Sequence, residues 1–435
     1  MAVATRQAGA PPRAQSTGRA PGLGEIALHW APIVSVACLA SSGELKQVPF
    51  VAAVPIDFTL LTMIMVVLSS AISLAFAPRL PSPLQLGVLG LFLVMAAAGS
   101  GPIPEGFYAN DKFQKLWTIT FVALLGGIFA VRNERDLRHL LFAVWASAFV
   151  VSGGLPFGTG SADATGRLTG ATGGSIFFGQ AAGLVILGVL VVALVGEKWT
   201  RNRVAFAAVI VGLELWILFS IASRGPIQSL VVGSIVALFL GLRMVRGRKV
   251  GRRTMLMFVG VVGLVTIGWI NAPQPAKDRI LLYGSGGSAD IRLQFWQVTW
   301  GLVDGSPFGH GWGSWSRLYL TGEVPPLYTY PHNLFLELWY EVGLVGLLAF
   351  VMMGVLVARN LFRHIRTSPV VAVFGLSLIA YLMMGAMFSG DINNRRMFFA
   401  VIGGSAAVLA APAELRTEDD EDELDLGSPV SAARR

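Results

Sequence analysis

The sequence is short of charged residues and contains a single cysteine. Only 13% of its 435 residues are charged, whereas soluble domains average about 25%. The hydrophobic share is 54% and the mean hydropathy is +0.65. These values exclude a soluble globular, disordered or coiled-coil protein and leave a membrane protein. The lone Cys38 excludes an intrachain disulfide, a cysteine-based zinc site and a cysteine-ligated cluster.

The apolar residues come in long runs rather than in alternation, which disfavours a β-barrel and predicts an all-α polytopic membrane protein. A helix of about 20 apolar residues crosses a bilayer. Twelve spans are predicted, at residues 26–42, 56–77, 84–100, 113–131, 137–154, 175–196, 204–222, 225–242, 254–271, 333–358, 370–388 and 396–412. The first of these reads as an uncleaved span rather than a signal peptide, because no small-residue cleavage site closes it.

The net charge of +8 is interpreted as a topology signal rather than a nucleic-acid site. Twelve spans place both termini on one side, and about two-thirds of the 33 Lys and Arg residues fall on that side. The positive-inside rule then makes both termini cytoplasmic. The predicted organisation is a cytoplasmic disordered tail at 1–24, a transmembrane domain at 25–412, and an acidic disordered cytoplasmic tail at 413–435.

The longest predicted external loop spans residues 272–332. Within it, residues 290–300 predict a short amphipathic helix on the outer membrane interface. Its apolar stripe consists of Phe295, Trp296, Thr299, Trp300 and Val303.

Residues 306–315 of this loop read S-P-F-G-H-G-W-G-S-W. Glycines at alternate positions permit tight turns and close approach to a ligand, but the spacing does not match a Walker A loop. Trp312 and the neighbouring aromatic residues fit either an interfacial belt or a platform for sugar rings or a lipid. Both interpretations stay open on the sequence.

A nearly loopless external turn, Ser223-Arg224-Gly225-Pro226, joins two predicted spans. Pro226 suits the first turn of a helix that enters the membrane from outside. The free N–H groups and positive dipole end of that helix, together with Arg224, predict an anion site at the membrane surface. The alternative is an arginine that snorkels to lipid headgroups.

The tenth span opens with His332 and Asn333, again from outside. Asn333 is a suitable N-cap. An imidazole at this position can exchange a proton near neutrality, although a lone histidine is more often structural. Below it, Glu337 and Glu341 share one helix face, and Glu214 is a further acid inside a span. Such acids either support proton coupling or fix helix packing.

Several arginines lie in the predicted external segments. The predicted cytoplasmic loops show no comparable pattern. The external arginines are Arg167, Arg224, Arg292, Arg395 and Arg396. Arginine forks suit phosphate oxygens. The pattern therefore predicts an anionic substrate, such as a diphosphate, handled at the outer leaflet.

The sequence resembles the O-antigen ligase and polymerase superfamily of bacterial polytopic glycosyltransferases over about residues 165–400. The closest stretch, H-N-L-F-L-E-L-W-Y-E-V-G-L-V-G at 332–346, is similar to the signature H-N-x-x-L-x-x-x-x-E-x-G-x-x-G. S-R-G at 223–225, R-L-T-G at 167–170, and Arg292 with Trp296 followed by S-P-F-G-H-G at 306–311 are similar to other family elements. Many members carry P-N soon after R-L-x-G, whereas this chain has Gly174-Ser175.

The resemblance implies a metal-independent, inverting glycosyltransferase of cell-surface polysaccharide or lipopolysaccharide biosynthesis in the cell envelope. It would move a glycan from undecaprenyl diphosphate to the hydroxyl of a lipid- or glycan-linked acceptor, at the outer face of the cytoplasmic (inner) membrane. His332, Arg224 and Arg292 are the predicted catalytic residues. The predicted substrate-binding residues are Arg167, Arg395, Arg396, Asn333, Glu341, Trp296 and Trp312. No cofactor and no metal are expected, since no D-x-D pair lies outside the acidic tail.

The sequence is also compatible with two other functions. A polymerase uses the same donor and differs only in its acceptor. A secondary transporter or lipid-linked glycan flippase would explain Glu214 and the arginines, but the sequence shows neither internal repeats nor broken helices in matched halves.

Overall fold

The structure is a computed structural model that describes residues 23–101, 107–157, 161–162, 168–169, 175–196, 200–221, 223–245, scattered positions between 263 and 278, 288–322 and 329–407. The first half of the chain forms α1 (Leu23–Ala40), α2 (Ser42–Leu45), α3 (Pro49–Ala52), α4 (Phe58–Phe76), α5 (Pro83–Ala98), α6 (Phe107–Lys115), the π-helical turn η1 (Leu116–Thr120), α7 (Phe121–Ala130), α8 (Glu134–Phe157), α9 (Ser175–Val195) and α10 (Arg201–Ile221). The second half forms α11 (Arg224–Val245), α14 (Ser288–Leu302), the 3-10 helix η2 (Ser314–Thr321), α15 (Leu334–Arg363), α16 (Pro369–Ala386), the 3-10 helix η3 (Ile392–Arg395) and α17 (Arg396–Ser405).

Among the described residues, the regular structure is helical apart from one short antiparallel ladder. Strand β1 (Ser161–Ala162) pairs with β2 (Leu168–Thr169), so Ser161 lies opposite Thr169. The all-α prediction did not include this ladder, which sits in the loop before α9. It adds one short strand pair and leaves the helical architecture unchanged.

Among the described residues, eight helices are long and apolar enough to cross a membrane, and α1 and α5 are shorter apolar helices. The predicted count of twelve is not confirmed. The span predicted at 254–271 lies largely outside the described residues. In the last predicted span, α17 ends at Ser405 after 10 residues, which is short for a bilayer of roughly 30 Å.

Local sequence signals set where several helices begin. The carboxylate of Asp57 accepts hydrogen bonds from the backbone N–H groups of Thr59 and Leu60 at the start of α4. Ser82 and Gln85 form a reciprocal capping box at the start of α5, where Pro83 occupies the first turn. These contacts satisfy N–H groups that a helix start otherwise leaves unpaired.

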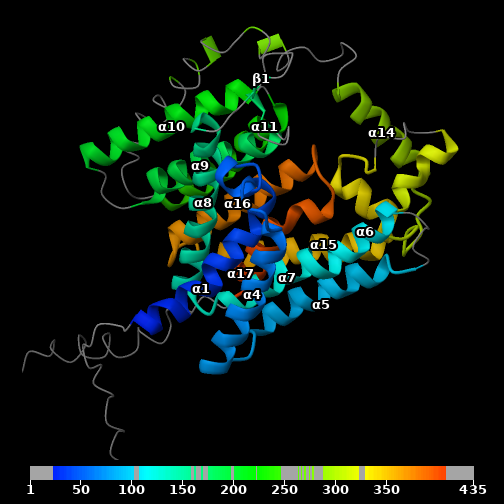
Figure 1. Ribbon diagram of the computed structural model, residues 1–435, viewed down its shortest axis with the longest axis horizontal. Coiled ribbons are helices and arrows are strands. Elements are labelled where there is room, and N and C mark those ends of the chain that lie inside the picture. Colours follow the sequence, from blue (N-terminus) through cyan, green and yellow to red (C-terminus); the bar gives the residue numbers. More distant parts are fainter. Residues whose placement is uncertain are drawn as a thin grey trace, which may run out of the picture.

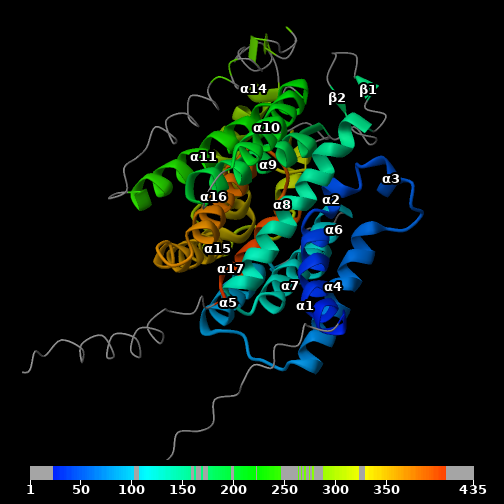
Figure 2. The same ribbon diagram turned by 90° about the vertical axis from the view of Figure 1, so that its left-hand side faces the viewer.

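The helices form a bundle in which α17 occupies the interior (Figures 1 and 2). Residues Phe398 to Ser405 of α17 are all buried, and α17 packs mainly against α7. By contrast, α4 exposes a row of apolar side chains on one face, namely Leu60, Ile64, Val67, Leu68 and Ile72. A face of this kind is stable when lipid rather than water covers it.

The two ends of the bundle differ in character. In both views α14 and the β1–β2 ladder lie at one end, and α1 begins at the opposite end (Figures 1 and 2). The starts of α11 and α15 lie at the α14 end, as their side-chain contacts below show. Arg224, Arg292 and His332 therefore lie at the same end of the bundle.

Candidate active site

Helix α14 is held against the segment that precedes α15. The indole Nε1 of Trp296 donates a hydrogen bond to the carbonyl of Pro331 at 3.1 Å. The ring of Phe295 stacks on the His332 imidazole, with centroids 6.5 Å apart and planes 11° apart. Tyr330 covers another part of the imidazole at 4.5 Å. These contacts fix the histidine between α14 and the start of α15.

His332 has unusual backbone and electrostatic surroundings. Its φ of 57° makes it the one non-glycine residue with positive φ among the described residues. Such strain costs about 1–3 kcal/mol and concentrates at functional sites. Burial, together with the charge of Arg292, lowers the pKa of His332 from 6.5 to about 4. The imidazole is therefore neutral at physiological pH.

The start of α15 has the cap that the sequence predicts. The Asn333 side chain accepts hydrogen bonds from the backbone N–H groups of Phe335 and Leu336, at 3.1 and 3.3 Å. This confirms Asn333 as the N-cap. Because the Asn333 side-chain oxygen caps α15, the backbone at residue 333 is fixed relative to the helix. This constrains the position of the preceding His332.

Phe388 connects the start of α11 to this cluster. The Phe388 ring lies 6.0 Å from the Trp296 ring, and a Cβ added at Gly225 would lie 3.6 Å from Phe388 Cβ. Arg224 begins α11 beside that glycine. A helix start carries about half a positive charge, so the α11 terminus and Arg224 together add positive charge next to the α14–His332 contact.

The glycine-rich loop pairs with a break in α15. Gly343 has φ 66° and ψ −169°, which interrupts the helix. The N–H groups of His310 and Gly311 donate to the carbonyls of Tyr340 and Glu341 at 3.0 and 2.9 Å, and the N–H of Val345 donates to the Pro307 carbonyl at 3.0 Å. The loop thus replaces the hydrogen bonds that the break removes.

Close backbone contact explains why glycines occupy both sides of this junction. A Cβ at Gly343 would meet the Pro307 carbonyl, and a Cβ at Gly309 would meet the Gly343 nitrogen and the Glu341 carbonyl. Gly309, Gly311 and Gly313 all have positive φ, as alternate glycines in a tight loop predict. The sequence did not predict the break, because Gly343 lies inside one continuous apolar run.

A buried ion triad lies beneath the break. Lys112 Nζ is 2.7 Å from Glu337 Oε1 and 2.6 Å from Glu341 Oε2, and all three side chains are 0% exposed. The prediction that the two acids share a helix face is correct. Glu341 serves here as a partner of Lys112, so a substrate does not reach it in this arrangement.

Sequence reasoning missed Lys112. It lies one residue before the span predicted at 113–131, whereas the structure places it inside α6, which runs through η1 into a helical span. The sequence did contain a signal for this contact, because a lysine lies at the edge of one apolar run and two carboxylates lie within another. Their pairing needed the fold, because residues 112 and 337 are far apart in sequence.

The segment before α17 adds a second polar layer. Tyr108 donates a hydrogen bond to Asp391 Oδ2 at 3.0 Å, and the Ile392 N–H donates to Glu337 Oε1 at 3.2 Å. Asn393 Nδ2 donates to the Lys112 carbonyl at 2.8 Å. These bonds join α6, α15 and η3 into one network.

The remaining predicted residues have different surroundings. Arg395 is 7% exposed and donates to the Gly385 carbonyl at 3.3 Å. Arg396 donates to Ser42 Oγ at 2.7 Å. Trp312 is fully buried and its Nε1 donates to the Ala96 carbonyl at 2.9 Å, so this residue packs in the interior instead of offering a face to a substrate. Arg167 lies outside the described residues.

Residues 211–351 match the family model described as O-antigen ligase. Over this stretch the chain is similar to the O-antigen ligase family. No curated protein matches the sequence. The match, with the apolar helices, supports a bacterial membrane protein that is similar to glycan ligases and polymerases.

The matched stretch contains the starts of α11 and α15, all of α14 and the glycine-rich loop. It therefore includes Arg224, Arg292, His332 and the two acids of the triad. Lys112, Asp391 and Arg395 lie outside the matched residues. The helices before and after the matched stretch thus complete the polar network around Glu337 and Glu341.

Proposed function

We propose that the protein transfers a glycan from undecaprenyl diphosphate to an acceptor hydroxyl at the outer face of the bacterial cytoplasmic membrane, with both termini cytoplasmic. The observation that carries the proposal is the packing of neutral His332 against Phe295 of α14, the helix that also carries Arg292, at the same end of the bundle as Arg224 and the start of α11. Cations supply the diphosphate contacts, and the neutral imidazole supplies a proton acceptor.

The reaction follows from these roles. The acceptor oxygen attacks the anomeric carbon while the bond from that carbon to the phosphate oxygen breaks. The hydroxyl proton passes to His332, and undecaprenyl diphosphate leaves with the bonding electron pair. Arg224 and Arg292 stabilise the charge that develops on it. Attack opposite the leaving group inverts the anomeric configuration, and no step needs a metal.

Donor binding would also activate the base. The charge of Arg292 contributes to the low pKa of His332 in the free protein. A diphosphate beside Arg292 offsets that charge and raises the pKa of His332. The imidazole thereby becomes a stronger proton acceptor when the donor is in place.

The test of function compares three variants in a transfer assay. Purified protein in liposomes receives a lipid-diphosphate-linked oligosaccharide, an acceptor and EDTA, and gels and mass spectrometry follow the glycan. Arg224→Ala and His332→Ala should each lower the rate by at least about 100-fold. Arg317→Ala is the matched control, because Arg317 is exposed and should retain full activity.

The products also separate the alternatives. Transfer to an added acceptor supports a ligase, and lengthening in repeat-unit steps supports a polymerase. Full activity of Arg224→Ala contradicts the proposed mechanism. A donor that crosses the bilayer without being consumed identifies a transporter instead.

The coupling between Arg292 and His332 gives a pH prediction. In the wild type the His332 ring should titrate near pH 4, so its neutral form persists down to about pH 5. Arg292→Gln removes one of the two causes and should shift the titration upward, toward 6.5. Histidine NMR in nanodiscs measures both values, with His332→Asn assigning the signal. Titration at 6.5 in both proteins would contradict the assigned electrostatics.

A further inference from the structure

Tyr330 lies in the segment that leads into α15 and packs on the imidazole of His332. The two ring centroids are 4.5 Å apart, and the ring planes are inclined by 55°. The Phe295 ring of α14 lies further from the imidazole, at 6.5 Å. Of these two rings, Tyr330 therefore makes the closer contact with the base of the proposed reaction.

The backbone at His332 needs support from its neighbours, because its φ of 57° is strained for a residue with a side chain. The indole of Trp296 donates to the Pro331 carbonyl at 3.1 Å, and the Asn333 side chain caps α15. Both contacts act on the backbone on either side of His332. Tyr330 instead packs on the imidazole, so it acts on the orientation of the side chain.

The hydroxyl of Tyr330 lies near the charged groups that join η3 to α15. Burial and the negative charges of Asp391 and Glu337 raise the pKa of this hydroxyl. The charge of Arg395 and the N–H of Gly390 partly offset the rise. A tyrosine ordinarily titrates near pH 10, so the Tyr330 phenol stays protonated. The ring therefore meets His332 as an uncharged surface.

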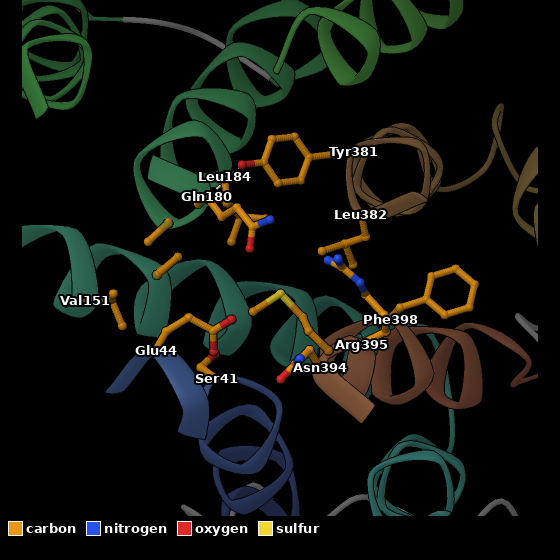
Figure 3. Close-up of a pocket in the computed structure, with 13 residues that line it drawn as sticks. Ser41, Glu44, Val151, Gln180, Leu184, Tyr381, Leu382, Asn394, Arg395 and Phe398 are labelled. Atoms are coloured by element: carbon orange, nitrogen blue, oxygen red, sulfur yellow. Dashed lines mark hydrogen bonds between the residues drawn. The ribbon is translucent and has the colours of Figure 1, made fainter. Parts of the chain in front are cut away.

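Arg395 also lines a small pocket, together with Glu44 and Gln180 (Figure 3). The volume of this pocket, about 30 Å³, has room for water but not for a sugar ring. The Arg395 guanidinium donates to the Gly385 carbonyl at 3.3 Å. Arg395 therefore acts on Tyr330 as a fixed charge of the segment before α17, and the pocket is too small to bring a substrate there.

Burial is the larger of the two causes that lower the pKa of His332 to about 4, and the charge of Arg292 is the smaller. Burial acts because neighbouring side chains keep water away from the charged imidazolium. The Tyr330 ring, at 4.5 Å, is one of these neighbours. Removing the ring should therefore raise the pKa of His332 even with the Arg292 charge in place.

We propose that Tyr330 is a positioning residue for glycan transfer, and that its ring fixes the orientation of the His332 imidazole and keeps water away from it. The role in transfer rests on the proposed function, whereas the effect on the imidazole does not. Tyr330 acts through His332 and needs no contact with either substrate. Loss of the ring should slow the chemical step, which depends on alignment of the base with the acceptor hydroxyl, and leave the arginine contacts to the diphosphate in place.

The test measures the imidazole and the reaction separately in the full chain. In nanodiscs, histidine NMR of Tyr330→Ala should show the His332 titration rising from about 4 toward 6.5. At about pH 8 the imidazole is neutral in both proteins. There kcat should fall about 10- to 100-fold while the KM for the lipid-linked donor stays within about threefold. Tyr330→Phe keeps the ring and should restore the wild-type titration and most of the rate.

Two further variants serve as control and reserve. Trp300→Ala removes an aromatic side chain of α14 that is 63% exposed, and it should leave the His332 titration and the transfer rate unchanged. Tyr330→Val keeps part of the apolar volume, so it reads the same contact if Tyr330→Ala does not fold. It should shift the His332 titration in the same direction as Tyr330→Ala.

The two measurements separate failure of this proposal from failure of the proposed function. A His332 titration near 4 in the folded variants that lack the ring overturns the proposal, as does a Tyr330→Phe protein that behaves like Tyr330→Ala. A raised titration with the wild-type rate at about pH 8 would instead contradict His332 as the base, and with it the proposed function.

Discussion

Lys112→Met should destabilise the folded protein by about 3–5 kcal/mol, because it leaves the carboxylates of Glu337 and Glu341 buried without their shared cation. Both acids and the lysine are fully buried, and one oxygen of each carboxylate lies within 2.7 Å of the lysine Nζ. Thermal unfolding in detergent, followed by tryptophan fluorescence, measures the loss. Glycan transfer should fall in parallel, since α15 carries His332 at its start.

Two companion variants separate charge from size in this experiment. Lys115→Met removes an exposed lysine that pairs with Asp111 and should change stability by less than about 1 kcal/mol. Adding Glu337→Gln and Glu341→Gln to Lys112→Met removes all three charges and should restore much of the stability. If Lys112→Met unfolds at the wild-type temperature, the ion triad does not stabilise the packing of α6 against α15.

Gly343→Ala should cost about 3 kcal/mol or more and abolish transfer. The residue has φ 66° and ψ −169°, a conformation that strains any other residue by about 1–3 kcal/mol. Its added methyl group would also meet the Pro307 carbonyl and the Gly309 nitrogen, and overpacking adds about 1–3 kcal/mol. The loop at 306–311 would then separate from α15.

Gly354→Ala is the matched control in the same helix. A Cβ at Gly354 has nothing within 4 Å, and alanine favours a helix interior by about 1 kcal/mol over glycine. This variant should therefore unfold at the wild-type temperature or above. Equal effects of the two substitutions would show that the break at Gly343 is not required.

The break explains why two separated sequence motifs occur together. The P-F-G-H-G stretch at 307–311 donates to and accepts from the backbone on either side of Gly343. Each motif is incomplete without the other, because a helix break in an apolar environment needs substitute hydrogen-bond partners. The loop and α15 therefore form one structural unit that positions His332.

Helix bounds and helix caps could be predicted from the sequence, whereas the burial of individual side chains could not. Helical spans such as α9 and α16 were predicted near their observed bounds, because an unbroken apolar run is a local property of the chain. The Asn333 cap was predicted because capping depends on neighbouring residues. Trp312 was expected to contact substrate, and the fold buries it instead, since exposure depends on what packs against a side chain.

The sequence alone determined the helical membrane class, most helical segments and the resemblance to O-antigen ligases. These follow from composition, periodicity and short spacings. Only the tertiary structure paired Lys112 with Glu337 and Glu341, joined the glycine-rich loop to the break at Gly343, and placed Glu44 and Arg395 on one pocket. Each of these involves residues distant in the chain, and their proximity depends on how the helices pack rather than on any local pattern.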